Sequence, residues 1–210
     1  MKEKVCYIVG AGSFDNKPFD VKKDDFVIAA DGGYEYLKKL NINSDILLGD
    51  FDSLCEIPNH PNIIRHPRQK DDTDMILAVE TGLELGYKYF IIYGGLGGRL
   101  DHTIANIQTI TYISRQGAKA YLVGEGLVIT AVTNDKIQFD SSKVGVISIF
   151  CSGSDAKGVY LKNLKYELCD TILTSNYPLG VSNEFIGKDS IVSVDSGTLV
   201  VMWNENGFRI

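Results

Sequence analysis

Short apolar segments alternate with helix-like segments along the first 124 residues of this 210-residue chain. The apolar segments are largely uninterrupted, as is typical of parallel strands that are covered on both faces. Between them, residues such as Met75, Val79 and Leu83 recur at helical spacing. This alternation predicts an α/β domain with a parallel sheet. The predicted strands are 5–9, 26–30, 46–48, 63–66, 89–93 and 121–123, and the predicted helices are 33–40, 72–85 and 101–115.

The pattern changes after residue 124. Short segments rich in Val, Ile, Thr and Tyr are separated by turn residues, and few of them have helical periodicity. Segments 191–194 and 198–203 are predicted to be strands joined by a tight turn at 195–197. The sequence therefore predicts two closely packed domains, an α/β domain over 1–124 and a small all-β domain, sandwich or barrel-like, over 125–210.

Charge and composition exclude some classes of protein. The net charge is −6 without a basic tract, which argues against a nucleic-acid partner. No apolar run approaches the roughly 20 residues that span a bilayer, and the N-terminal segment is typical of a first strand rather than a secretory signal. The cysteines form no Cys-x-x-Cys pair, so we expect reduced, mostly buried thiols in a cytoplasmic protein. They are Cys6, Cys55, Cys151 and Cys169.

Two acid-rich motifs follow predicted strands. Asp50 and Asp52 are two residues apart, so in extended chain both face one side and can bind one cation. Magnesium prefers such oxygen ligands together with phosphate oxygens. Asp71, Asp72 and Asp74 open a predicted helix, where capping explains one or two acids but not three that repel one another. We therefore expect functional roles for Asp71 and Asp74, while the alternative reading of both motifs is polar turns and helix caps.

A glycine-rich loop separates the strand 89–93 from the helix 101–115. Its glycines let backbone amides approach a phosphate closely, and the following helix N-terminus favours negative charge. Arg99 is suited to fork onto phosphate oxygens, and Asp101 either caps the helix or contacts the ligand. The loop is not a Walker A motif, and a loop of this kind also occurs purely as a sharp turn. Its glycines are Gly94, Gly95, Gly97 and Gly98.

Two more strand ends carry glycine-containing segments, 10–12 and 31–33, the second beginning with Asp31 and Gly32. In open α/β sheets, ligands bind outside the carboxyl ends of the strands. Because several unusual strand ends would meet at one edge, the sequence predicts a site for magnesium and a polyphosphate there. No Ser-His-Asp or Cys-His arrangement stands out, and His102 is interpreted as a helix-start residue.

Taken in order, these motifs resemble those of the thiamin pyrophosphokinase family. The resemblance covers nearly the whole chain and implies an N-terminal α/β (Rossmann-like) catalytic domain followed by a C-terminal β-sandwich domain that binds thiamin. The matching pieces are Ala30-Asp31-Gly32-Gly33, Gly49-Asp50-Phe51-Asp52-Ser53, Asp71-Asp72-Thr73-Asp74, Gly98-Arg99-Leu100-Asp101-His102 and Ser182-Asn183-Glu184-Phe185.

The resemblance also implies a reaction and roles for residues. Diphosphate would pass from ATP to the hydroxyl of thiamin, giving thiamin diphosphate and AMP, in a homodimer with thiamin near the subunit boundary. By position, magnesium would be held by Asp50, Asp52 and Asp74 with Asp71 close by. The nucleotide side would comprise Asp31, Gly32, Arg99, Asp101 and the glycines of the loop, and the thiamin end would comprise Ser182 and Asn183. Trp203, the one tryptophan, is suited either to stack on thiamin or to be buried in a strand.

Group transfer of this kind depends mainly on positioning and on neutralising charge. An Asp with an ordinary pKa of about 3.9 is a weak base toward an alcohol, so most of the carboxylates are expected to be ligands. If one is a base, Asp71 or Asp74 is the candidate. Arg99, together with magnesium, is expected to act catalytically by stabilising the departing charge. Three other functions stay open at this point: a pyrophosphokinase for a pterin alcohol, a nucleotidyltransferase that uses the Asp-x-Asp motif, and a nucleotide-binding module without turnover.

Overall fold

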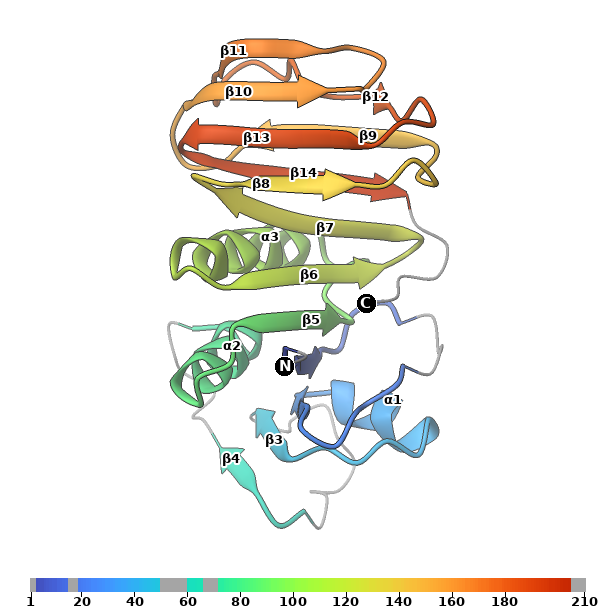
Figure 1. The fold of residues 1–210 in the computed structure, drawn as a ribbon. Coiled ribbons are helices and arrows are strands. Elements are labelled where there is room, and N and C mark those ends of the chain that lie inside the picture. The colour runs from blue at the N-terminus through green and yellow to red at the C-terminus, as the bar shows by residue number, and fades with distance from the viewer. Residues whose placement is uncertain (1–2, 15–18, 50–59, 66–71, 205–210) are drawn as a thin grey trace. The chain divides into compact units, whose positions relative to one another are not determined.

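The computed structural model describes residues 3–14, 19–49, 60–65 and 72–204 (Figure 1). The chain forms two compact units, each with its own core. Unit 1 comprises Met1–Thr109 and Ala120–Glu125, and unit 2 comprises Ile110–Lys119 and Gly126–Ile210.

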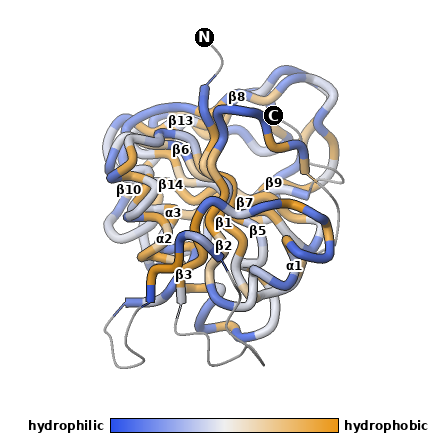
Figure 2. The backbone as a smooth tube through the Cα atoms, turned by 90° about the horizontal axis from the view of Figure 1, so that it is seen from below, coloured by the Kyte–Doolittle hydropathy of each residue, from blue (hydrophilic) through white to orange (hydrophobic). Residues whose placement is uncertain are grey.

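Unit 1 is built on a sheet with the strand order β6-β5-β1-β2-β3-β4. Strand β1 pairs in parallel with both β2 and β5, and β3 pairs in parallel with β2 and β4. Figure 2 shows that the central strands are largely hydrophobic, as burial on both faces requires. The predicted parallel-sheet α/β architecture is confirmed. The strands are β1 (Cys6–Val9), β2 (Phe26–Ala30), β3 (Ile46–Gly49), β4 (Ile63–Arg65), β5 (Tyr89–Tyr93) and β6 (Lys119–Gly124).

Three helices lie in the described part of the chain, close to the predicted positions: α1 (Gly33–Lys39), α2 (Asp74–Glu84) and α3 (Leu100–Arg115). Helix α2 contacts β1, β2 and β3 through a face that includes buried Met75 and Val79. A Cβ built on Gly82 would lie 2.6 Å from a ring carbon of Phe90, so this glycine lets α2 approach the sheet closely.

Unit 2 contains two antiparallel sheets, and the predicted β-sandwich is confirmed. Between them lies an aromatic cluster in which Phe139 contacts both Phe185 and Trp203 at ring-centroid distances of 5.1 Å. Trp203 is only 3% exposed, so it is a core residue and not a surface for stacking on a ligand. One sheet has the order β12-β9-β14-β7 and the other β11-β10-β13-β8. The strands are β7 (Leu127–Thr133), β8 (Lys136–Phe139), β9 (Val146–Cys151), β10 (Ala156–Lys162), β11 (Leu168–Leu173), β12 (Asn183–Glu184), β13 (Ser190–Ser196) and β14 (Thr198–Asn204).

The tight turn predicted at 195–197 joins β13 to β14, but these strands do not pair with each other. They belong to different sheets, so the turn carries the chain from one sheet to the other. The β7–β8 connection makes a similar crossing at Asn134, and the two corners are joined by hydrogen bonds. Gly197 N donates to Asn134 Oδ1 at 2.8 Å, and Asn134 N donates to Gly197 O at 3.1 Å.

Helix α3 belongs to both units, because its last six residues cluster with unit 2. Polar side chains attach this end of the helix to the sandwich. Arg115 Nη2 donates to Ser152 O at 3.1 Å, and the Ser114 and Thr133 hydroxyls are 2.9 Å apart. The sequence places a domain boundary after residue 124 and does not reveal this shared helix. The assignment of one substrate to each sequence domain stays a prediction.

The cysteine expectation is partly wrong. Cys6 is buried, and burial raises the pKa of its thiol, but Cys169 is exposed and Cys151 is half-buried. Cys55 lies outside the described residues. Among the described helices, none is long and apolar enough to cross a membrane.

Candidate functional site at the carboxyl edge of the unit 1 sheet

The segments that follow β1 and β5 lie side by side and are joined by three backbone hydrogen bonds. Gly94 has φ +63°, and a Cβ there would overlap the carbonyl oxygen of Gly10. Only glycine therefore allows this close approach. The bonds run from Gly10 N to Tyr93 O (2.8 Å), from Gly12 N to Gly94 O (2.7 Å) and from Ser13 N to Leu96 O (2.8 Å).

The predicted glycine loop is anchored at one end and open at the other. Buried Asn106 of α3 donates through Nδ2 to Gly95 O at 2.7 Å, which fixes the start of the loop. Gly97 and Gly98 both have positive φ, +75° and +66°. Successive backbone amides in such a turn form a concave donor surface that suits an anion. A Cβ on Gly98 would meet no atom within 4 Å, so this part of the loop borders open space.

Arg99 and Asp101 form a bidentate ion pair at the start of α3. Arg99 Nη2 lies 2.6 Å from Asp101 Oδ2, and Nε lies 3.2 Å from Oδ1. Both side chains are exposed, at 72% and 65%. Asp101 Oδ1 also accepts from His102 N at 3.0 Å. Of the two roles expected for Asp101, the structure shows local bonding at the helix start, which holds the Arg99 guanidinium beside the loop.

This ion pair predicts a pH dependence. The hydrogen bond from Arg99 lowers the pKa of Asp101 below its ordinary value of 3.8. A lowered pKa in the folded state means that the contribution of the pair is present above the ordinary pKa and is lost as the pH falls through the lowered one. We expect carboxyl-carbon NMR titration of Asp101 to give a pKa below 3.8, and we expect Arg99→Ala to raise it. A wild-type pKa at or above 3.8 would contradict the pairing.

The ends of β2 and β3 also meet at this edge. Asp31 has φ +48°, an unusual backbone conformation for a non-glycine residue, and its N–H donates to Leu48 O at 2.7 Å. A Cβ built on Gly49 would lie 3.2 Å from Asp31 Cα. Gly32 then serves as the N-cap of α1. Asp31 is therefore next to the strand end that Asp50 follows in the sequence.

Asp74 is the first residue of α2. The capping function at this helix start is performed by Thr73, whose Oγ1 accepts from Ile76 N at 3.3 Å. The next residue, Met75, places its Cε 2.8 Å from a Cβ built on Gly10, so the start of α2 lies near the end of β1. An acid in the first turn is also favoured by the helix dipole, so the position of Asp74 agrees with a structural role as well as with the predicted metal role.

The other predicted metal ligands, Asp50, Asp52 and Asp71, lie outside the described residues. Within the described part of the chain, no three His, Cys, Asp or Glu side chains gather closely enough to hold a metal ion. The predicted magnesium site therefore stays a prediction.

The two residues predicted at the thiamin end have different environments. Ser182 has φ +58°, and its N–H donates to Ser148 Oγ at 3.1 Å. Asn183 is buried, and its amide holds the backbone of Tyr166: Oδ1 accepts from Tyr166 N at 3.0 Å, and Nδ2 donates to Tyr166 O at 2.7 Å. In this structure Asn183 therefore has a structural role, and it follows directly after Ser182 with its unusual positive φ.

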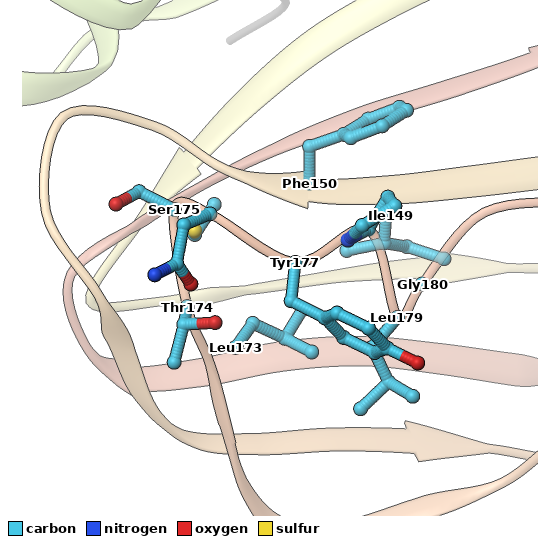
Figure 3. A pocket seen from close by; sticks show the side chains of 11 residues that line it. Ile149, Phe150, Leu173, Thr174, Ser175, Tyr177, Leu179 and Gly180 are labelled. Carbon is cyan, nitrogen blue, oxygen red and sulfur yellow. The ribbon is translucent and has the colours of Figure 1, made fainter.

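A pocket of about 220 Å³ lies close to Ser182 in the sequence (Figure 3). It is formed by β9 and by the segment that leads from β11 to Gly180. The lining combines apolar side chains with hydroxyl, amide and thiol groups and contains no charged residue. The lining residues are Ile149, Phe150, Cys151, Leu173, Thr174, Ser175, Asn176, Tyr177, Pro178, Leu179 and Gly180.

Two side chains at the carboxyl edge were not predicted from the sequence. A Cβ on Gly97 would overlap Ser13 Oγ and would lie 2.5 Å from Glu125 Oε1, so both side chains contact this glycine. Ser13 follows β1 and Glu125 follows β6. The available signal was that each lies within four residues of the end of a predicted strand, at the edge where the predicted ligands also lie.

A parallel α/β sheet with interlocked glycine loops and an arginine at its carboxyl edge is typical of proteins that bind nucleotide phosphates. Models of two families match the chain: "Thiamin pyrophosphokinase, catalytic domain" over residues 20–122, and "Thiamin pyrophosphokinase, vitamin B1 binding domain" over residues 134–199. Together they span most of the sequence. The chain belongs to the thiamin pyrophosphokinase family.

Individual relatives agree. The chain is 29% identical over 162 residues to thiamine pyrophosphokinase of Bacillus subtilis. The aligned residues cover 73% of this chain and 75% of that protein. It is 25% identical over 200 residues to thiamin pyrophosphokinase 1 of Caenorhabditis elegans, covering 88% and 81%. The crystal structure of the Bacillus subtilis enzyme superposes with a TM-score of 0.85 at 25% identity, covering 97% of this chain and all of that one.

The predicted family, fold class and enzyme class are therefore confirmed, and the protein is a transferase of the kinase type. These relationships do not favour the pterin-alcohol or nucleotidyltransferase alternatives. The roles of the individual site residues stay predictions.

Proposed function

We propose that this chain transfers the diphosphate group of ATP to the hydroxyl of thiamin, giving thiamin diphosphate and AMP, with magnesium as the cofactor. The observation that carries the proposal is the meeting of the β1 and β5 glycine segments, with Arg99 beside them, at the carboxyl edge of a parallel sheet. The β5 glycine segment and Arg99 lie in the region matched by the catalytic-domain model, whereas the β1 glycine segment precedes it. Unit 2 contains the whole region matched by the vitamin-binding model.

On the nucleotide side, the N–H groups of Gly97 and Gly98 would bind phosphate oxygens, together with guanidinium donors of Arg99. Asp101 accepts from Nε and Nη2 of Arg99, so the remaining N–H groups of the guanidinium can donate to phosphate oxygens. The pairing also fixes the guanidinium plane, which reduces the entropy lost when phosphate binds. Asp31, at the neighbouring strand ends, would lie near the nucleotide.

The proposed magnesium ligands are Asp50, Asp52, Asp71 and Asp74. Carboxylate oxygens are the donors that magnesium prefers, and Asp50 directly follows in the sequence Gly49, the last residue of β3, which lies beside Asp31. When bound, magnesium would neutralise phosphate charge as the transfer proceeds. Asp71 or Asp74 is the candidate to accept the proton of the attacking hydroxyl, and the attack on the β-phosphorus would be in line with the departing AMP.

On the acceptor side, Ser182 and Asn183 would mark the thiamin end. The uncharged pocket of Figure 3 adjoins them in the sequence and, with its apolar and hydroxyl lining, is better suited to a ring of the vitamin than to a triphosphate. The cationic thiazolium of thiamin would also be favoured by the acidic edge.

We further propose a cytoplasmic homodimer with thiamin near the subunit boundary. Large apolar side chains at and next to the β9–β12 edge are exposed, and burial against a second copy would remove them from water. They include Val144 (73% exposed), Val146 (42%), Val181 (41%) and Ile186 (44%). Light scattering of the purified protein tests this: a monomer at micromolar concentration would contradict it.

An acceptor comparison tests the reaction. Purified protein with ATP and magnesium is incubated with thiamin, with a hydroxymethyl pterin, or without an acceptor, and AMP is measured. We expect AMP formation that depends on thiamin. Formation that depends on the pterin would support the rival acceptor, and intact ATP in all three reactions would support a binding module without turnover.

A further inference from the structure

Glu125 stands at the carboxyl edge of the unit 1 sheet, directly after β6. Its carboxylate oxygen Oε1 and the Ser13 hydroxyl both contact Gly97 of the glycine loop. The Glu125 side chain is exposed, and no hydrogen bond or ion pair joins its carboxylate to any residue in the described part of the chain. A carboxylate acceptor and a hydroxyl are thus presented together beside the loop that is proposed to bind ATP.

The backbone at Glu125 is unfavourable for glutamate. Glu125 has φ +53° and Gly126 has φ +71°, the conformation of a two-residue turn that normally carries Asn, Asp or Gly at its first position. Glutamate in this backbone conformation therefore makes the folded protein less stable than Asn or Gly would. Such an outlier beside a binding edge indicates that the side chain is retained for a role other than forming the turn.

The charge of Glu125 restricts what it can bind. A carboxylate repels phosphate oxygens but accepts hydrogen bonds from hydroxyl groups, which the ribose of a nucleotide provides. A metal site is not supported, since among the described residues no cluster of His, Cys, Asp or Glu forms around it.

The position of Glu125 along the carboxyl edge of the sheet also agrees with binding of ribose. Strand β6 is four places from β3 in the order β6-β5-β1-β2-β3, or roughly 19 Å at about 4.8 Å per strand. Acids that follow β3 are the proposed metal ligands for the terminal phosphates, so the nucleoside end would extend toward β5 and β6. Beside Ser13, half-buried Phe14 stacks on Tyr36 at 5.1 Å and offers aromatic surface for a base.

We propose that Glu125, assisted by Ser13, binds the ribose hydroxyls of ATP and makes the site specific for ribonucleotides. This inference rests on the proposed function, because it takes the glycine loop as the phosphate site. Glu125 is then a specificity-determining residue, and its contact with Gly97 ties ribose recognition to the position of the phosphate loop.

Binding of ATP and of 2′,3′-dideoxy-ATP, each with magnesium and without thiamin, tests the proposal by calorimetry. We expect wild-type protein to bind ATP roughly 10- to 100-fold more tightly than 2′,3′-dideoxy-ATP, because hydrogen bonds to a charged group contribute about that much to affinity. Glu125→Asn should reduce this ratio to about threefold or less, because the side chain of Asn is shorter and uncharged and does not reach the ribose hydroxyls. The same variant should raise Tm by about 2 °C, because Asn suits the turn. A loss of discrimination together with a gain in stability is not expected of a merely structural residue.

Asp170→Asn is the matched control. Asp170 is also an exposed acid with positive φ (+46°), but it lies in β11 of the sandwich, so the binding ratio should stay at the wild-type value. The proposal is overturned if Glu125→Asn keeps the wild-type ratio, or if the wild type does not distinguish the two nucleotides or binds neither. Formation of AMP with thiamin is measured separately. Ribose discrimination without AMP formation would contradict the proposed reaction and support the role of Glu125. AMP formation without ribose discrimination would support the reaction and contradict the role of Glu125.

Discussion

Replacing Asp50 or Asp74 by Asn should abolish magnesium-dependent AMP formation while the protein stays folded. Asn keeps the size of the side chain but removes the negative charge that a magnesium–phosphate complex requires. We expect kcat to fall by roughly 100- to 1000-fold, which corresponds to about 3–4 kcal/mol of transition-state stabilisation. The measurement is the initial rate of AMP formation with ATP, magnesium and thiamin at saturating concentrations.

Circular dichroism and thermal unfolding of the same variants provide the structural control. Asp72→Asn is the matched variant, because Asp72 is an exposed member of the same acidic motif without an assigned role. It should keep near-normal turnover. Normal turnover in Asp50→Asn or Asp74→Asn would remove the residue concerned from the metal site.

Gly94→Ala should be among the most destabilising single substitutions in unit 1. The new Cβ would overlap the Gly10 carbonyl oxygen, which is backbone and cannot rotate away, and φ +63° is itself unfavourable for alanine. We expect a loss of at least about 3 kcal/mol from clash and strain together. For a chain of this length that loss lowers Tm by roughly 10 °C, which differential scanning fluorimetry measures directly.

Gly98→Ala separates backbone strain from steric overlap. Gly98 has a similar φ of +66°, but its Cβ would enter open space. Only the strain of about 1 kcal/mol applies, so Tm should fall by about 3 °C. Equal losses in the two variants would mean that the β1 and β5 segments are not interlocked as described.

Periodicity was sufficient to predict the sheet and helices of unit 1, because parallel strands buried on both faces leave continuous apolar runs such as 26–30 and 89–93. The all-β character of the second part was predictable for a similar reason. The path of its chain was not: the turn at Gly197 has the composition of a hairpin, yet packing of both faces of the sandwich sends β13 and β14 into different sheets. Pairing of this kind is decided by tertiary contacts, which local sequence does not encode.

The site shows the same division. Glycines and charged residues at predicted strand ends can be recognised from the sequence, so Arg99, Asp101 and Gly94 were predicted to belong to the site. The interlock of the β1 and β5 segments, and the contacts of Ser13 and Glu125 with Gly97, join residues that are far apart in the sequence. Asn183 was predicted at the thiamin end from a motif, whereas its bonds to Tyr166 give it a structural role that no motif reveals.

The central claim, transfer of an intact diphosphate group from ATP to thiamin, is tested most directly by one time course followed by ³¹P NMR. Wild-type protein with ATP, magnesium and thiamin should form AMP and thiamin diphosphate at equal rates, without free phosphate or pyrophosphate. Release of pyrophosphate, formation of ADP with thiamin monophosphate, or unchanged ATP would contradict the proposed function.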